Sequence, residues 1–189
     1  MTTPDDVLAF WFGLPPAKWW AKDDAFDADL RARFGETLEA GWRGELDDWK
    51  DTPRGRLALV IVFDQFSRNI HRGTMKMFRC DQRALALTTQ GLARGDDAKL
   101  EPMERYFLLM PLMHAEDASL QRRSVEEFEK LRASAPEALA KSFDDAVTYA
   151  RRHAEIVERF GRFPHRNAIL GRPSRPEEEA FLREPNSSF

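Results

Sequence analysis

The side chains best suited to binding a ligand gather in one short segment near the end of the chain. Residues 160–172, FGRFPHRNAILGR, contain three arginines, one histidine and no acid. Pro164 and Gly171 disturb regular backbone there, so the polar side chains project from an irregular segment. Because guanidinium groups make two-pronged contacts with carboxylates and phosphates, this basic segment predicts an anion site. The predicted ligand-binding residues within it are Arg162, His165, Arg166 and Asn167.

A second polar group follows the longest apolar run, LALVIVF at residues 57–63. Asp64 and Arg68 are four residues apart, which places them on one face of a helix, and Asn69 comes directly after them. Charged groups at the end of a buried helix need partners. Either Asp64 pairs with Arg68 inside the protein, or Asp64, Arg68 and Asn69 contribute to a ligand site. Both interpretations stay open at this point.

The third group follows Pro111 and contains a histidine and two acids. His114, Glu116 and Asp117 lie within four residues, and His153 lies on a predicted helix farther along the chain. His114, Glu116 and His153 are the candidate catalytic residues, since histidine titrates nearest to neutral pH, and Asp117 is a candidate ligand contact. The alternative is that the two acids only begin a helix, where acids are favourable. The spacing matches no known metal motif, so we predict no metal and no cofactor.

These groups support three functional hypotheses. In the first, which we favour, some of the arginines line a pocket for an anionic small molecule or the acidic end of a peptide. In the second, the protein is an enzyme in which His114 or His153 works with Asp64, Glu116 or Asp117. In the third, the protein is purely structural or an interaction protein, and the arginines pair internally with those same acids.

The remaining sequence predicts helices that position these groups. Thr3-Pro4 and Thr52-Pro53 are helix starts, with a capping hydroxyl and a proline in the first turn. Apolar residues four apart from Phe26 to Trp42 form one helix stripe, and the tryptophans are expected in the core. Helices are also predicted from Pro53 through the apolar run, at 74–93, from Pro102 with an interruption at Pro111, at 116–132, from 134 to Gly161, and from a capping box at 174–177.

The expected fold is therefore all-α, with seven or eight helices and antiparallel neighbours, in one domain spanning residues 1–189. A net charge of −3 argues against a nucleic-acid partner, and the apolar run is too short to cross a membrane. One cysteine, Cys80, excludes an internal disulfide, and the first residues carry acids where a signal peptide carries cations. We expect a cytoplasmic protein, with self-association into a homo-oligomer left open.

Several long motifs resemble those of a known family. They are VLAFWFG at 7–13, TPRGRLALVIVFDQFSRNIHRGT at 52–74, ERYFLLMPLMHAED at 104–117, the basic segment, and SRPEEEAFL at 174–182. Together they are similar to the bacterial family catalogued as domain of unknown function 924, over nearly the whole chain. The resemblance implies a fold similar to the tetratricopeptide-repeat superfamily, a right-handed superhelical array of antiparallel helix pairs. It implies no established activity. Arrays of this kind present a concave groove in which peptides or anions bind.

Overall fold

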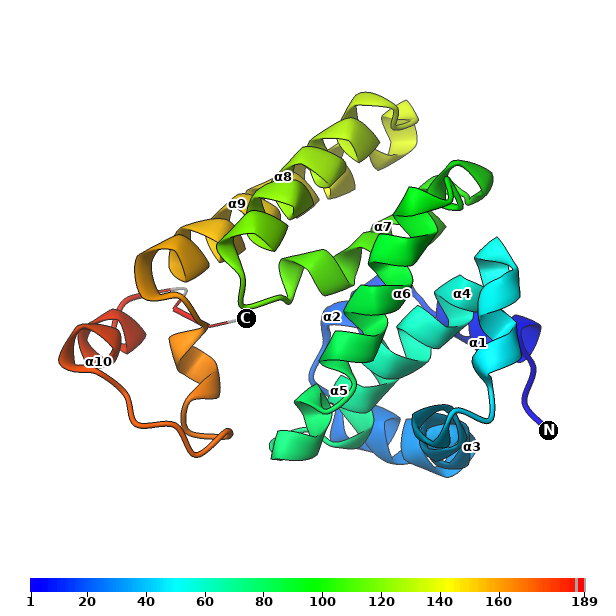
Figure 1. Ribbon diagram of the computed structural model, residues 1–189, viewed down its shortest axis with the longest axis horizontal. Coiled ribbons are helices and arrows are strands. Elements are labelled where there is room, and N and C mark those ends of the chain that lie inside the picture. The colour runs from blue at the N-terminus through cyan, green and yellow to red at the C-terminus, as the bar shows by residue number, and fades with distance from the viewer. Residues whose placement is uncertain (186, 189) are drawn as a thin grey trace. The chain divides into compact units, whose positions relative to one another are not determined.

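The computed structural model describes residues 1–185 and 187–188, and the regular structure in that part of the chain is helical throughout, without a strand (Figure 1). Counting 53–70 as one helix, it has eight helices of seven residues or more, which confirms the all-α prediction. The α-helices are α1 (Pro4–Phe12), α2 (Pro16–Trp20), α3 (Asp24–Arg43), α4 (Pro53–Val60), α5 (Ser67–Ile70), α6 (Asp81–Ala93), α7 (Pro102–Met113), α8 (Ala118–Ala133), α9 (Ala140–Phe160) and α10 (Pro176–Leu182).

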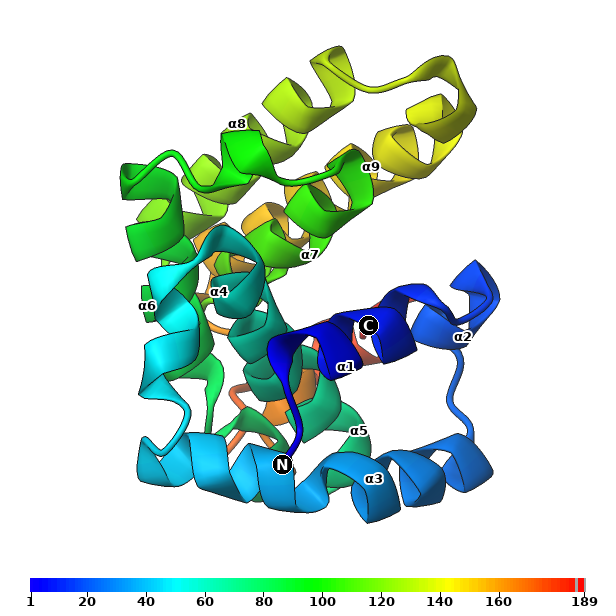
Figure 2. The same ribbon diagram turned by 90° about the vertical axis from the view of Figure 1, so that its right-hand side faces the viewer.

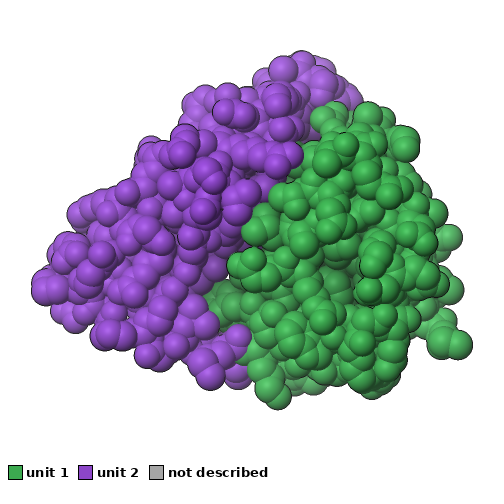
Figure 3. All heavy atoms as spheres, in the orientation of Figure 1, with its two compact units in different colours: residues 1–72, 76–111 green, residues 73–75, 112–189 purple. Residues whose placement is uncertain are grey.

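The chain forms two compact units, which Figure 3 colours separately. The first unit contains residues 1–72 and 76–111, and the second contains residues 73–75 and 112–189. The assignment of the whole chain to one domain stays a prediction. Each unit is described below by itself.

One long buried helix forms the centre of the first unit. It begins at Pro53, where the Thr52 hydroxyl accepts a hydrogen bond from the Gly55 amide at 3.1 Å, and it ends at Ile70. Residues 55–67 are all buried, as the apolar run predicted. Between α4 and α5 the helix widens into a π-helical turn, η2 (Ile61–Phe66), in which the Ser67 amide donates to the Val62 carbonyl. Neither the apolar run nor the caps around it indicate this turn.

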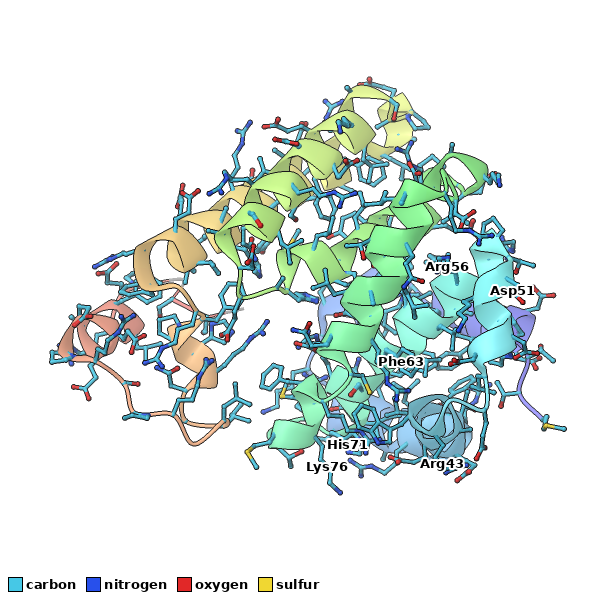
Figure 4. All side chains as sticks on the ribbon, in the orientation of Figure 1. Arg43, Asp51, Arg56, Phe63, His71 and Lys76 are labelled. Atoms are coloured by element: carbon cyan, nitrogen blue, oxygen red, sulfur yellow. The ribbon has the colours of Figure 1, made fainter. Side chains whose placement is uncertain are left out.

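The neighbours of this helix differ along its length. The α4 part packs against α1, α6 and the 3-10 helix η1 (Asp47–Asp51), while α5 packs against α3 (Figure 2). A buried ion pair fixes the connections: Arg56 Nε donates to Asp96 at 3.1 Å, and both residues are 2% exposed. Arg56, labelled in Figure 4, also donates through Nη2 to the Lys50 carbonyl at 2.7 Å. Arg56 thereby joins η1 and the loop after α6 to α4.

Three local expectations were wrong. Pro111 does not interrupt α7, which continues to Met113. Its missing amide removes one helical hydrogen bond, close to the end of the helix. The helix expected from residue 74 begins at Asp81, after a short 3-10 helix η3 (Met75–Phe78). Trp11 is buried as expected, but Trp20 is 55% exposed and Trp42 is 38% exposed.

The second unit contains an antiparallel pair, α8 and α9, followed by the basic segment and α10 (Figure 1). Two exposed ion pairs join the helices: Arg132 with Asp144 at 2.6 Å, and Glu129 with Arg151 at 2.7 Å. Gly161 ends α9 in the left-handed conformation, with φ of 71°. The chain then turns through a 3-10 helix, η6 (Pro164–Arg166), and its apolar side chains pack together in a core of Ile156, Val157, Phe160, Phe163 and Phe181.

A substitution at Gly55 tests the tight start of the central helix. A Cβ at this position would lie 2.1 Å from the Trp49 carbonyl oxygen, which belongs to rigid backbone. We expect Gly55→Ala to lower the free energy of unfolding by about 1 to 3 kcal/mol, measured by urea denaturation. The matched control is Gly35→Ala in α3, where the nearest atom is 3.8 Å away. There, improved helix propensity is expected to raise stability by about 0.5 to 1 kcal/mol, and equal effects at both sites would contradict the prediction.

Candidate functional site

The predicted site residues of the first unit form an internal network. Asp64 is buried and accepts hydrogen bonds from Arg68 Nη2 at 3.2 Å and from Gln65 Nε2 at 2.6 Å. Arg68 also donates to Asp81 at 3.1 Å. Asn69 donates from its side-chain amide to the Gln65 carbonyl at 2.9 Å. The pairing of Asp64 with Arg68, four residues apart, is thus confirmed, while a ligand-binding role for these residues stays a prediction.

Glu116 anchors the basic segment of the second unit. Its two oxygens accept from Arg172 Nη1 at 2.6 Å and from Arg172 Nη2 at 2.9 Å, and Oε1 also accepts from the Phe163 amide at 2.8 Å. Burial by itself would raise the pKa of Glu116, but the hydrogen bonds from Arg172 and Phe163 outweigh it and lower that pKa. Glu116 is therefore ionised and holds the segment in place, as the structural hypothesis predicted for this acid.

Glu178, which the sequence analysis missed, is the second anchor. It is 0% exposed and accepts two bonds of 2.7 Å from Arg162, through Nε and Nη2. Asn167 Nδ2 donates to it at 3.2 Å, and Arg175 donates through its amide at 2.7 Å and its Nη2 at 3.0 Å. The hydrogen bonds from Arg162 lead the causes that lower the pKa of Glu178. Arg162 and Asn167 thus have an internal partner, although not one of the acids named from the sequence.

Two expectations about helix starts bear on these acids. Asp117 is exposed and caps α8, since its Oδ1 accepts from the Leu120 amide at 2.9 Å. Asp117 therefore begins this helix, as the alternative predicted, while its role as a ligand contact stays a prediction. The expected capping box at 174–177 is displaced by one residue: α10 begins after Arg175, and Glu178 rather than Glu177 accepts from the amide at the cap. This displacement is what turns Glu178 toward the basic segment.

The remaining predicted residues form what we call the histidine cluster: His114, His153, His165 and Arg166. His153, His165 and Arg166 lie against the ring of Phe163, which is 0% exposed, and His114 lies beside His153. The ring centroids of His153 and His165 lie 5.4 and 5.6 Å from that of Phe163, and the Arg166 Cζ lies 4.5 Å above it. The His114 ring is 6.4 Å from the His153 ring. Three of the chain's four histidines thus come together with one arginine.

His153 is held in the neutral form. Its Nδ1 lies 2.8 Å from the Tyr149 carbonyl oxygen, which can only accept, so Nδ1 carries the proton and Nε2 carries the lone pair. Burial, followed by the charges of His114, Arg166 and His165, lowers the pKa of His153 to about 3, against the opposing effect of the bond to Tyr149. The neighbouring groups thus disfavour a positive charge on His153, whose Nε2 is a hydrogen-bond acceptor.

Other chemistry finds little support in the described residues. No group of three or more histidine, cysteine, aspartate or glutamate side chains in residues 1–185 and 187–188 is arranged to hold a metal ion. Cys80 is buried, and burial raises the pKa of its thiol. Within the same residues, no helix combines the length and the apolar character that crossing a membrane requires.

The comparisons with known proteins agree on a family. Residues 7–186 match the model of a family described as bacterial protein of unknown function, DUF924. A solved structure of a protein of unknown function from Agrobacterium tumefaciens is similar, with a TM-score of 0.85 and 37% sequence identity over 95% of this chain and 96% of that one. No curated protein was found to match. The chain belongs to the bacterial DUF924 family.

Proposed function

We propose that the protein binds a small anionic molecule, or the carboxylate end of an acidic peptide, at the histidine cluster of its second unit. The observation that carries the proposal is the convergence of His153, His165 and Arg166 on Phe163, with His114 beside His153. The lowered pKa of His153 supports it, because neighbouring cations contribute to that shift. A site with positive potential favours an anion.

The chemistry of the cluster suggests what the ligand carries. The planar guanidinium of Arg166 suits a carboxylate or phosphate group, and the imidazole nitrogens of His114 and His165 can donate further hydrogen bonds. His153 instead provides an acceptor, because its proton is committed to the Tyr149 carbonyl. A ligand with a hydroxyl or ammonium group beside its anionic group would match this combination of donors and one acceptor.

The other residues predicted to bind a ligand are not part of this proposed site. Arg162 and Asn167 are bound to Glu178, and Asp117 caps α8, so we assign them to positioning the basic segment. Asp64, Arg68 and Asn69 of the first unit stay candidates for a ligand site, on the strength of the prediction from sequence.

Binding of inorganic phosphate and succinate, measured by isothermal titration calorimetry, tests the proposal. We expect the wild type to bind at least one of them, and Arg166→Gln to weaken binding about tenfold or more, since it removes the guanidinium fork. Arg159→Gln is the matched control, because Arg159 is an exposed arginine at the end of α9. If neither probe binds, or if Arg166→Gln binds as tightly as the wild type, the proposal fails.

A purely structural role is the second candidate, and the anchors at Glu116 and Glu178 favour it. In that case Arg166→Gln lowers the melting temperature while leaving any ligand binding unchanged. The enzyme hypothesis is supported less, because both oxygens of Glu116 are engaged by Arg172 and the Phe163 amide rather than by a histidine.

Three broader expectations belong to the same proposal. A tetratricopeptide-repeat-like right-handed array of helix pairs is supported by the antiparallel pairing of α8 with α9. A cytoplasmic location is supported by the single, buried Cys80. Self-association into a homo-oligomer is a further proposal, and analytical ultracentrifugation tests it.

A further inference from the structure

A patch on the first unit, separate from the histidine cluster, has the composition of an interaction surface. We propose that this Trp42 patch, formed by Trp42, Lys76, Arg79 and Arg83, binds an acidic segment of a partner protein. Trp42 lies in the last turn of α3 and is 38% exposed. Tryptophan and arginine are the residues most enriched among those that dominate the binding energy of protein interfaces.

The two arginines lie against the tryptophan ring. The Cζ atom of Arg83 is 4.7 Å from the ring centroid of Trp42, and that of Arg79 is 5.3 Å from it. Both distances are within the range of cation–π attraction, which is strongest for tryptophan. The ring and the two guanidinium groups therefore offer an apolar contact and two cationic forks at adjacent points of one surface.

Neighbouring groups hold these side chains in place. Arg83 Nη1 donates to the Gly41 carbonyl at 3.0 Å, and Arg79 Nη2 donates to Glu39. The end of α3 is itself fixed, since a Cβ on Gly41 would lie 2.8 Å from the Phe63 ring. The Nε of Arg79 is buried and has no hydrogen-bond partner in the described part of the chain. Side chains held in this way lose little conformational entropy when a partner binds.

The local charge favours an acidic partner although the protein is acidic as a whole. Besides Arg79 and Arg83, the exposed Lys76 follows α5 closely in sequence, near His71 (Figure 4). Burial is the main cause that lowers the pKa of His71; Arg79 and Lys76 lower it too, while Glu39 opposes them. The three cations outnumber Glu39 around this patch, which favours carboxylates.

A short peptide fits the patch better than a nucleic acid. Acids alternate with the cations along α3 and the turn after it: Glu39 pairs with Arg79, while Glu36 and Glu45 pair with Arg43. A continuous phosphate backbone would have to pass these carboxylates, and a net charge of −3 would oppose it. A peptide segment with a few spaced carboxylates can avoid these acids and carries less charge than a nucleic acid. One apolar side chain of the segment would contact Trp42.

Fluorescence anisotropy with a fluorescein-labelled peptide of Glu-Glu-Leu repeats tests the proposal. At about 50 mM salt, where surface charges are weakly screened, we expect the wild type to bind this probe. Arg83→Glu is expected to weaken binding about tenfold or more, and so is Lys76→Glu, at a position where the side chain is exposed. Arg151→Glu, at an exposed arginine of α9, is the control and is expected to change binding less than about twofold.

Three results would overturn the inference. The first is an absence of binding by the wild type. The second is binding by both charge-reversed variants as tight as that of the wild type, with circular dichroism confirming that they are folded. The third is equal affinity for single-stranded oligothymidylate, which would mark the patch as a nucleic-acid or general anion surface. The histidine cluster lies on the other unit, so failure here leaves the proposed function standing, and Arg166→Gln should bind the peptide normally.

Discussion

Replacing Asp96 with alanine is expected to lower the free energy of unfolding by about 3 to 5 kcal/mol, the usual effect of leaving a buried charge without its partner. The charge left behind belongs to Arg56, which is 2% exposed. Its Nη1 already has no hydrogen-bond partner in the described part of the chain. Without Asp96, its Nε would lose the acceptor to which it now donates. Urea denaturation followed by circular dichroism measures the change.

The neighbouring acid provides the control. Asp97 pairs with Arg105 at 3.3 Å, and both side chains are partly exposed. Asp97→Ala is therefore expected to cost less than about 1 kcal/mol. A double variant with Arg56→Met and Asp96→Leu should recover much of the loss, because apolar side chains can replace a buried ion pair. If Asp96→Ala and Asp97→Ala are equally stable, Arg56 is not the buried, dependent charge that the structure describes.

The second large effect is expected at Glu178. Glu178→Ala removes the acceptor shared by Arg162, Arg175 and Asn167, and it should lower the free energy of unfolding by about 3 kcal/mol. Glu177→Ala is the matched control on the same turn of α10. The Glu177 carboxylate is exposed and forms an ion pair with Arg175 at 3.3 Å. We expect less than about 1 kcal/mol there. A loss at Glu177 as large as that at Glu178 would contradict this assignment.

Acid pH offers an independent check on Glu178. Its pKa in the folded protein is lowered below its ordinary value of 4.5, chiefly by the hydrogen bonds from Arg162. The ionised form is therefore favoured by folding, so its contribution is complete above about pH 5 and declines as the pH falls through 4.5 toward the folded pKa. The difference in stability between the wild type and Glu178→Gln should shrink between about pH 6 and pH 3.5. A difference that grows on acidification would refute the role of Glu178.

The elements with strong periodic patterns could be predicted from the sequence, and so could contacts between residues close along it. The buried helix from Pro53, the stop at Gly161 and the pair Asp64–Arg68 follow from caps, an apolar run and a four-residue spacing. The role of Glu116 was also foreseen, because a basic segment without acids needs a partner from elsewhere in the chain.

The features that the sequence concealed depend on tertiary packing. Glu178 looked like an ordinary acid in the first turn of a helix, where its charge needs no special partner. Its burial depends on where α10 packs, which periodicity does not specify. Exposure of Trp42 was likewise hidden, since its spacing from Phe26 places it on the apolar stripe of α3.

The π-helical turn at Ile61–Phe66 gives the buried helix one residue more than a regular α-helix of that span would hold. Each residue of an α-helix turns the side chains by about 100°, so the inserted residue changes the phase of everything that follows. This explains why α4 faces α1 and α6 whereas α5 faces α3, although the backbone is continuous. One continuous helix thereby presents two faces that point in different directions.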